Sequence, residues 1–207
     1  MSLDSSETPS KTQKSENGNV SPNFKSDAEV KICSDESENS WSYIMAHHTK
    51  VNNIISKLEQ HFTVFIHTST VFFKEKGKVK SLEKPTISGL VFIQGKLSKI
   101  HSFLNENCPG IFLVKDHSTK QPARIPDSEM QRFMSISRLS PNRIRIMSKP
   151  LDYYSTGHEM VEITSGILSG VKGYIVRVSR DRCLITSLGG ITVAIGDITK
   201  ESFEKND

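Results

Sequence analysis

The sequence has few of the residues that build disulfide frameworks, and it has no run long enough to form a membrane span. Its three cysteines, Cys33, Cys108 and Cys183, are far apart, with no C-x-x-C pair and no metal-ligand spacing to a histidine. An odd number of scattered cysteines argues against a disulfide framework and favours a reducing compartment. No apolar run approaches the ~18 residues that cross a bilayer, and no apolar segment of a secretion signal opens the chain. We therefore expect a cytoplasmic protein without a membrane segment.

Catalytic motifs are also missing. The seven histidines include no H-E-x-x-H pattern, and neither a P-loop nor a G-x-S-x-G sequence is present. Cys108 stands beside Pro109 in an apolar segment, which predicts a small buried side chain rather than a nucleophile. Glu159 and Glu162, near His158, are typical of a solvated strand face. The sequence predicts a protein that is not an enzyme and needs no metal or cofactor.

Charge is unevenly distributed along the chain. Residues 1–40 contain four Lys and eight Asp or Glu, a net charge of −4, so the remaining residues must carry +8 to give the overall +4. Bulky apolar residues are too sparse before residue 40 to offset an ordering cost of ~1–2 kcal/mol per residue. We predict a disordered acidic tail over residues 1–39, followed by a basic folded part. Such a basic part favours a polyanionic partner.

From Trp41 to residue 137 the pattern predicts interleaved strands and helices. Thr49 is the expected N-cap of the first helix, and Pro126 and Asp127 mark the start of the last. The order β-α-β-β-α-β-α matches a ferredoxin-like α+β fold with a four-stranded sheet. The expected strands are 41–47, 63–73, 88–95 and 109–116, and the expected helices are 49–62, 96–107 and 125–137.

A basic segment interrupts this pattern. The stretch "KEKGKVKSLEK" at 74–84 contains five lysines around Gly77, which predicts a basic turn or hairpin tip. The apolar strand Leu90–Ile93 follows soon after it. A solvated, positively charged arm thus leads directly into a strand that must be buried. The lysines are Lys74, Lys76, Lys78, Lys80 and Lys84.

Residues 138–154 are expected to form a basic linker, because they contain four cations and two prolines, Pro141 and Pro150, which exclude a long helix. A solvated connector is the simpler interpretation of these charges, and a phosphate-contacting strip is the alternative.

Residues 155–207 alternate short β-rich runs with turns, which predicts a small all-β barrel. The turns are expected at Ser165-Gly166, Ser169-Gly170, Arg180-Asp181 and Gly189-Gly190.

Several stretches resemble a known family. "VEITSGILSGVKGYIVRV" resembles the KOW motif, with Gly166, Gly170, Lys172 and Gly173 at its centre. Upstream, "KPTISGLVFI", "NCPGIFLV" and "PARIPDSEM" resemble three landmarks of the NGN domain in the same order. The chain from residue 41 to about 204 is therefore similar to the NusG family of transcription elongation factors, and most similar to the specialised UpxY-type antiterminators. The resemblance implies an NGN-like domain at 40–137 and an SH3-like KOW barrel at 155–207.

The resemblance also implies a function and a set of contacts. Family members bind RNA polymerase through the β′ clamp helices, bridge the cleft over DNA, and suppress pausing and termination, often on long polysaccharide operons. The matching clamp patch here is Ile87, Ser88, Gly89 and Leu90, although core residues at a strand start would give the same pattern. The lysine segment would then face DNA or nascent RNA. We expect a monomer.

Other contacts carry over in the same way. His101 and Ser102 match positions that touch the β gate loop in some specialists, and Leu188 matches a position through which some KOW domains reach a ribosomal protein or termination factor. Ser42, Ser88, Leu90 and His158 depart from the family pattern, which indicates a diverged specialist. The alternative function is RNA binding or ribosome association without polymerase contact. Against it, "GLVFIQG" offers only one aromatic for base stacking.

Overall fold

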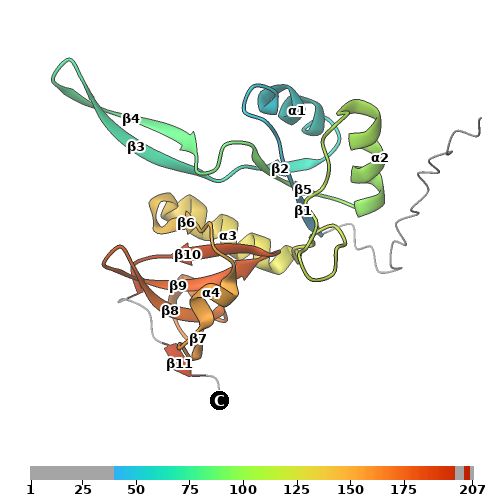
Figure 1. The fold of residues 1–207 in the computed structure, drawn as a ribbon. Coiled ribbons are helices and arrows are strands. Elements are labelled where there is room, and N and C mark those ends of the chain that lie inside the picture. Colours follow the sequence, from blue (N-terminus) through green and yellow to red (C-terminus); the bar gives the residue numbers. More distant parts are fainter. Residues whose placement is uncertain (1–39, 199–202, 206–207) are drawn as a thin grey trace, which may run out of the picture. The chain divides into compact units, whose positions relative to one another are not determined.

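The computed structural model describes residues 40–198 and 203–205, which all belong to one compact unit. The acidic tail predicted at 1–39 lies outside the described residues. Within the described part, no helix is both long and apolar enough to span a membrane. Figure 1 shows strands and helices interleaved in the first half and a strand-rich second half.

The first sheet has three strands in the order β1-β5-β2 and is covered by helices (Figure 1). Alternate residues of β5 point to opposite faces. Val91 and Ile93 pack with α1 and α2, whereas Phe92 packs with α3 in a second core. The elements are β1 (Trp41–Met45), α1 (Val51–Leu58), β2 (Thr63–Phe65), β5 (Leu90–Gln94), α2 (Leu97–Asn107) and α3 (Asp127–Leu139).

The fourth strand expected at 109–116 is wrong as a regular strand. This segment forms only isolated bridges, among them Leu113 with Ile44, and Ile125 takes over the edge of β1 by bridging to Trp41. The amides of Trp41 and Ile125 donate to each other's carbonyls at 2.9 and 2.8 Å. At Asp116, the last residue of this segment, the carboxylate accepts hydrogen bonds from the amides of Ser118 and Thr119, so the chain turns there and the short pairing with β1 is not extended.

Helix α1 also begins later than predicted. Lys50 rather than Thr49 stands at its N-cap and no side chain caps it, because the Thr49 hydroxyl is paired with the ring of His47 at 2.9 Å.

The hairpin tip predicted at Gly77 is confirmed, and the lysine segment runs from the end of one strand through this turn along nearly all of the next strand. β3 (Thr68–Glu75) pairs with β4 (Lys78–Pro85) as a separate two-stranded sheet, which Figure 1 shows as a long ribbon running out beside α1. Lys76 and Gly77 have φ of 50° and 78° at the tip, the two positive values that a two-residue hairpin turn requires. The strand expected at 63–73 is split in two by Ile66 and His67.

The second half forms one antiparallel sheet in the order β11-β7-β8-β9-β10-β6. The predicted turns at Gly166, Gly170 and Gly189-Gly190 all have positive φ. The strands are β6 (Ile144–Ile146), β7 (Met160–Ile163), β8 (Lys172–Val178), β9 (Asp181–Leu188), β10 (Ile191–Ile195) and β11 (Phe203–Lys205), with short helices η1 (Pro141–Arg143), α4 (Leu151–Ser155) and η2 (Gly166–Leu168) between them.

Residues 138–154 differ from the expected linker, because β6 pairs with β10 and joins the sheet. Two of the basic residues in this segment hold it against neighbouring parts of the second half. Arg143 donates to the carbonyls of Gly196 and Asp197, and Arg145 forms an ion pair with Asp181. Two of the four cations that suggested a connector therefore make specific contacts in the folded unit. The mixed α+β class is confirmed, and the strand-rich second half agrees with the predicted KOW-like module.

We expect Gly173→Ala to lower the free energy of unfolding by about 1–3 kcal/mol, because an added Cβ would lie 2.3 Å from the carbonyl oxygen of Ile185 on the neighbouring strand β9. Gly196→Ala is the matched control, since its Cβ would meet nothing closer than 3.6 Å. Urea unfolding of both variants measures the difference. Equal stabilities would contradict the close approach of β8 to β9.

Candidate functional site

The clamp patch predicted from the sequence is only partly on the surface. Ser88 is exposed and Ile87 is half-buried, whereas Leu90 is 5% exposed and packs in the core. Gly89 is held tightly. Its φ is +87°, its carbonyl accepts the amide of Ala46 at 2.8 Å, and an added Cβ would lie 1.8 Å from the Ala46 oxygen. Gly89 and Leu90 thus fix the start of β5 and leave Ile87 and Ser88 accessible.

Ile87 and Leu90 line a hollow of about 270 Å³ whose opposite wall comes from the second half of the chain. Met45, at the end of β1 and paired in register with Leu90, also lines the hollow and is 50% exposed. Apolar side chains thus line this hollow from both halves of the unit. The opposite wall includes Ile146, Met147, Pro150 and Ile191.

A hydrogen bond connects the two halves of the unit beside this hollow. The hydroxyl of Tyr43 donates to the carbonyl oxygen of Gly189 at 3.0 Å, across from β1 to the β9–β10 turn. Burial, and secondly the negative charge of Asp116, raise the pKa of Tyr43, so the hydroxyl keeps its proton as a donor. Gly189 also approaches closely, since an added Cβ would lie 2.3 Å from Ile125. The first sheet and the β9–β10 turn are therefore in direct contact.

His101 and Ser102 lie on a different element from the clamp patch. Both are exposed on α2, where the His101 ring is 3.3 Å from the Asn105 amide. Ser102 lines a separate shallow hollow together with Phe62 and Phe103. The structure does not bring these residues together with Ile87 and Ser88 in one hollow.

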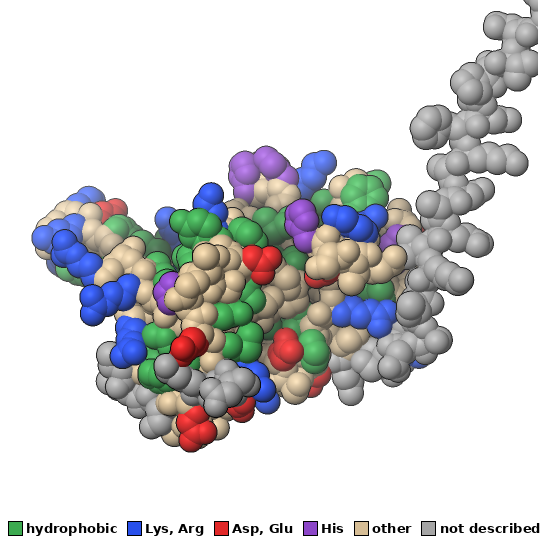
Figure 2. Space-filling view, turned by 60° about the horizontal axis from the view of Figure 1, so that its bottom comes forward, with side chains coloured by type: hydrophobic (Ala, Val, Ile, Leu, Met, Phe, Trp, Pro, Cys, Tyr) green, Lys and Arg blue, Asp and Glu red, His purple; other side chains and the backbone are tan. Residues whose placement is uncertain are grey.

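The five lysines predicted to face nucleic acid all lie on the β3–β4 hairpin and are exposed. Lys80 forms an ion pair with Glu75 at 2.5 Å. Figure 2 shows Lys and Arg side chains at the outer end of the hairpin, with hydrophobic surface beside them. The composition of "TSTVFF" predicted a strand but could not show that its apolar side chains lie on the surface. The exposed apolar side chains are Val71, Phe72, Phe73, Val79 and Leu82, each between 42% and 66% exposed.

The base of the hairpin contains a buried histidine that the sequence did not single out. His67 is 3% exposed, and its Nδ1 lies 2.6 Å from the Thr86 hydroxyl. Its Nε2 is buried and forms no hydrogen bond of good geometry among the described residues, and the Pro141 carbonyl acts on the ring only weakly. The ring lies 5.6 Å from that of Phe133 on α3, and the Thr70 amide donates to the Asn142 side chain at 3.0 Å. These contacts attach the hairpin base to the α3–η1 segment.

Two of the residues of the predicted KOW motif lie in a turn, and Lys172 and Gly173 begin β8. Gly166 and Gly170 have φ near +78°, and the Gly170 amide donates to Ile163 at 2.7 Å. Lys172 pairs with Glu162 at 3.3 Å.

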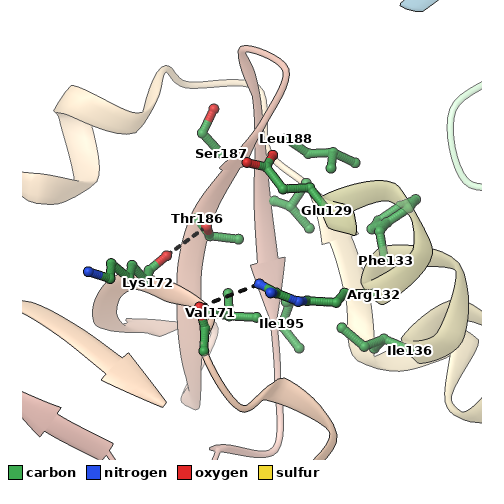
Figure 3. Close-up of a pocket in the computed structure, with 12 residues that line it drawn as sticks. Glu129, Arg132, Phe133, Ile136, Val171, Lys172, Thr186, Ser187, Leu188 and Ile195 are labelled. Carbon is green, nitrogen blue, oxygen red and sulfur yellow. Dashed lines mark hydrogen bonds between the residues drawn. The ribbon is translucent and has the colours of Figure 1, made fainter. Parts of the chain in front are cut away.

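Leu188 is 5% exposed and lines a hollow of about 280 Å³ between α3 and the sheet. The side chain of Arg132 extends into this hollow toward the Gly170 carbonyl (Figure 3). In this arrangement Leu188 is covered.

No group of three or more metal-ligating side chains occurs in residues 40–198 and 203–205. Cys108 and Cys183 are free and buried. Cys108, at 5% exposure, packs in the core between the first sheet and its two helices, so its predicted role as a small buried side chain is confirmed.

The first half of the chain is similar in sequence to one protein family. Residues 39–134 match the family model described as "Transcription termination factor nusG", which is just under half of the chain. A solved structure titled "Domain interaction in Thermotoga maritima NusG" is 16% identical with a TM-score of 0.45, and covers 83% of this chain and 98% of that chain. At that identity and TM-score the likeness bears on no functional question. No curated protein matches the chain.

The buried histidine makes stability depend on pH. Burial lowers the pKa of His67 below its ordinary value of 6.5, and the Pro141 carbonyl opposes this more weakly. The unfolded chain therefore binds this proton more readily than the folded one, so stability is complete above pH 6.5 and falls as the pH drops below it. Urea unfolding between about pH 7.5 and 5 should show a decline that His67→Gln reduces.

His48→Gln is the control for this measurement, because His48 is exposed. The decline should persist in that variant. An unchanged pH dependence in His67→Gln would show that His67 is not the group responsible.

Proposed function

We propose that this chain is a NusG-like transcription elongation and antitermination factor that acts by binding RNA polymerase. The observation that carries the proposal is the match of residues 39–134 to the NusG family model, which covers the three-stranded sheet, its helices and the hairpin. NusG-family proteins bind RNA polymerase. The motif resemblance of residues 155–207 to a KOW module supports the same assignment.

The hollow beside Ile87 is the surface that we assign to polymerase. It combines the accessible part of the clamp patch with the exposed Met45 side chain, and an apolar hollow of this kind accepts the apolar face of a helix. The resemblance names the β′ clamp helices as that partner. His101 and Ser102, exposed on α2, are assigned to a second contact with the β gate loop.

The remaining assignments follow the same resemblance. The hairpin lysines face DNA or nascent RNA in the elongation complex, where phosphates would release counterions on binding. The KOW turn at 166–173 and Leu188 are assigned to a ribosomal protein or termination factor; because Leu188 is buried here, this contact requires α3 to move away from the sheet. We assign the chain to the specialised UpxY-type group, acting as a cytoplasmic monomer on long operons such as polysaccharide loci.

A pull-down of purified RNA polymerase by the full chain tests the proposal. Met45→Glu places a charge in the assigned hollow at a half-exposed position, so the fold is expected to remain intact. If Met45 is a central contact, the affinity should fall by at least about 30-fold, the loss of ~2 kcal/mol that defines a binding hot spot. Leu90→Asp is unsuitable, since it would bury a charge in the core.

Met160→Glu is the matched control, because Met160 is 40% exposed on the distant strand β7. It should bind polymerase like the wild type. If Met45→Glu also binds normally, the assigned surface is wrong. If the wild type does not bind polymerase but retains RNA, the function is instead that of an RNA-binding or ribosome-associated module.

A further inference from the structure

The β3–β4 hairpin has two faces of different composition, which follow from its strand register. Directly opposed residues share a face, and alternate residues along a strand point to opposite faces. We call one the lysine face and the other the opposite face. The lysine face holds Ser69, Val71, Phe73, Glu75, Lys78, Lys80, Leu82 and Lys84; the opposite face holds Thr68, Thr70, Phe72, Lys74, Val79, Ser81, Glu83 and Pro85.

The lysine face has its charges and its apolar groups in adjacent rows. Along β4 it presents three cations, Lys78, Lys80 and Lys84. Along β3, one strand away or about 4.8 Å, it presents Val71 and Phe73, both 42% exposed. Leu82 lies directly across from Val71 and joins the two rows. A row of cations therefore runs beside a row of apolar side chains that includes an accessible aromatic ring.

The balance of charge on this face indicates an anionic partner. Its three lysines outnumber one acid, Glu75, which pairs with Lys80. Lys78 and Lys84 therefore add net positive charge to this face. The opposite face has one cation and one acid, Lys74 and Glu83. The net positive charge is therefore concentrated on the lysine face, next to Phe73.

We propose that the lysine face binds single-stranded nucleic acid, with phosphates along the β4 lysines and an unpaired base stacked on the ring of Phe73. The inference rests on the proposed function, since it specifies the ligand of the hairpin that was assigned there to nucleic acid. A cationic track beside an aromatic ring is the arrangement by which proteins bind single strands with little sequence preference.

A single strand fits this face better than a duplex does. A two-stranded ribbon can enter the major groove, but reading a duplex there requires donors and acceptors directed at base edges. Val71, Phe73 and Leu82 provide none. An aromatic ring gains stacking only from a base whose face is unpaired. A duplex offers these apolar side chains only thymine methyl groups, so the stacking of Phe73 is available only with an unpaired strand.

The test measures the affinity of the full chain, without polymerase, for a fluorescent single strand of about 12 nucleotides. Separate titrations use DNA, RNA and a DNA duplex of the same sequence, between about 50 and 200 mM salt. Tighter binding of single-stranded DNA, RNA or both than of the duplex is expected. Because polymerase is absent, failure here leaves the polymerase pull-down as an independent result.

Two adjacent phenylalanines on opposite faces give a matched pair. Phe73→Ala should weaken binding by at least about fivefold, the loss of one stacked base, and should leave the salt dependence unchanged. Phe72→Ala, on the opposite face, should bind like the wild type although Phe72 is the more exposed of the two.

The lysines give a second matched pair. Lys78→Gln should reduce the slope of log affinity against log salt by about 0.7, the value for one phosphate contact on a single strand. Lys74→Gln removes the same charge from the opposite face and should leave that slope unchanged.

Three outcomes would overturn the proposal: equal effects of Phe72→Ala and Phe73→Ala, equal affinity for duplex and single strand, or no binding of either strand. If the last result came with Phe73-dependent binding to vesicles of anionic lipid, the lysine face would instead be a membrane contact. All four side chains are exposed, and circular dichroism of each variant checks that the fold is intact.

Discussion

The pairing of β6 with β10 is the constraint on which most of the described unit depends. β6 begins five residues after the last residue of α3, and η1 occupies the space between them. With so short a connection, once β6 joins the sheet, α3 must lie against that same sheet. The helix then buries Met130 and Phe133 in a core shared by both halves of the unit. The hollow beside Ile87 exists because β6 forms one of its walls.

The sequence allowed the mixed class, most helices and the turns of the second half to be predicted. Helix α3 starts at Asp127 as expected, and the turn glycines have the positive φ that their neighbours suggested. These features are local, so neighbouring residues determine them. The features that were predicted wrongly depend on distant partners. The sequence could not show that Ile144 and Ile146 would find β10, or that Ile125 would replace the expected fourth strand at Trp41.

The sequence predicted the positive charge of the candidate site, but it did not predict which apolar side chains are exposed there. The lysines of 74–84 stood out in the sequence and all lie on the surface. Leu90 and Phe72 cannot be distinguished in the sequence, because both belong to short apolar runs with strand-like composition. Leu90 lies inside a covered sheet and is buried, whereas Phe72 lies in a two-stranded ribbon and is 66% exposed. Only the tertiary contacts distinguish them.

The attachment of the hairpin is confined to its base. His67, Thr86 and Asn142 hold the beginning of β3 and the end of β4, while the residues from Val71 to Leu82 are exposed. A ribbon anchored in this way presents its outer part to a partner without disturbing either core. The chemistry of the outer part can therefore change in evolution at little cost to folding.

A ribbon of two strands also leaves the outer backbone edge of each strand unpaired, and such edges pair readily with strands of another chain. Lysines on edge strands are one of the means by which proteins prevent this, because like charges repel a second copy. With the proposed nucleic-acid contact, the lysines of β4 would have two roles that depend on the same charge. A bound polyanion that neutralised these lysines would also remove the repulsion between two copies of the chain. The solubility of the protein would then depend on whether a polyanion is bound to the hairpin.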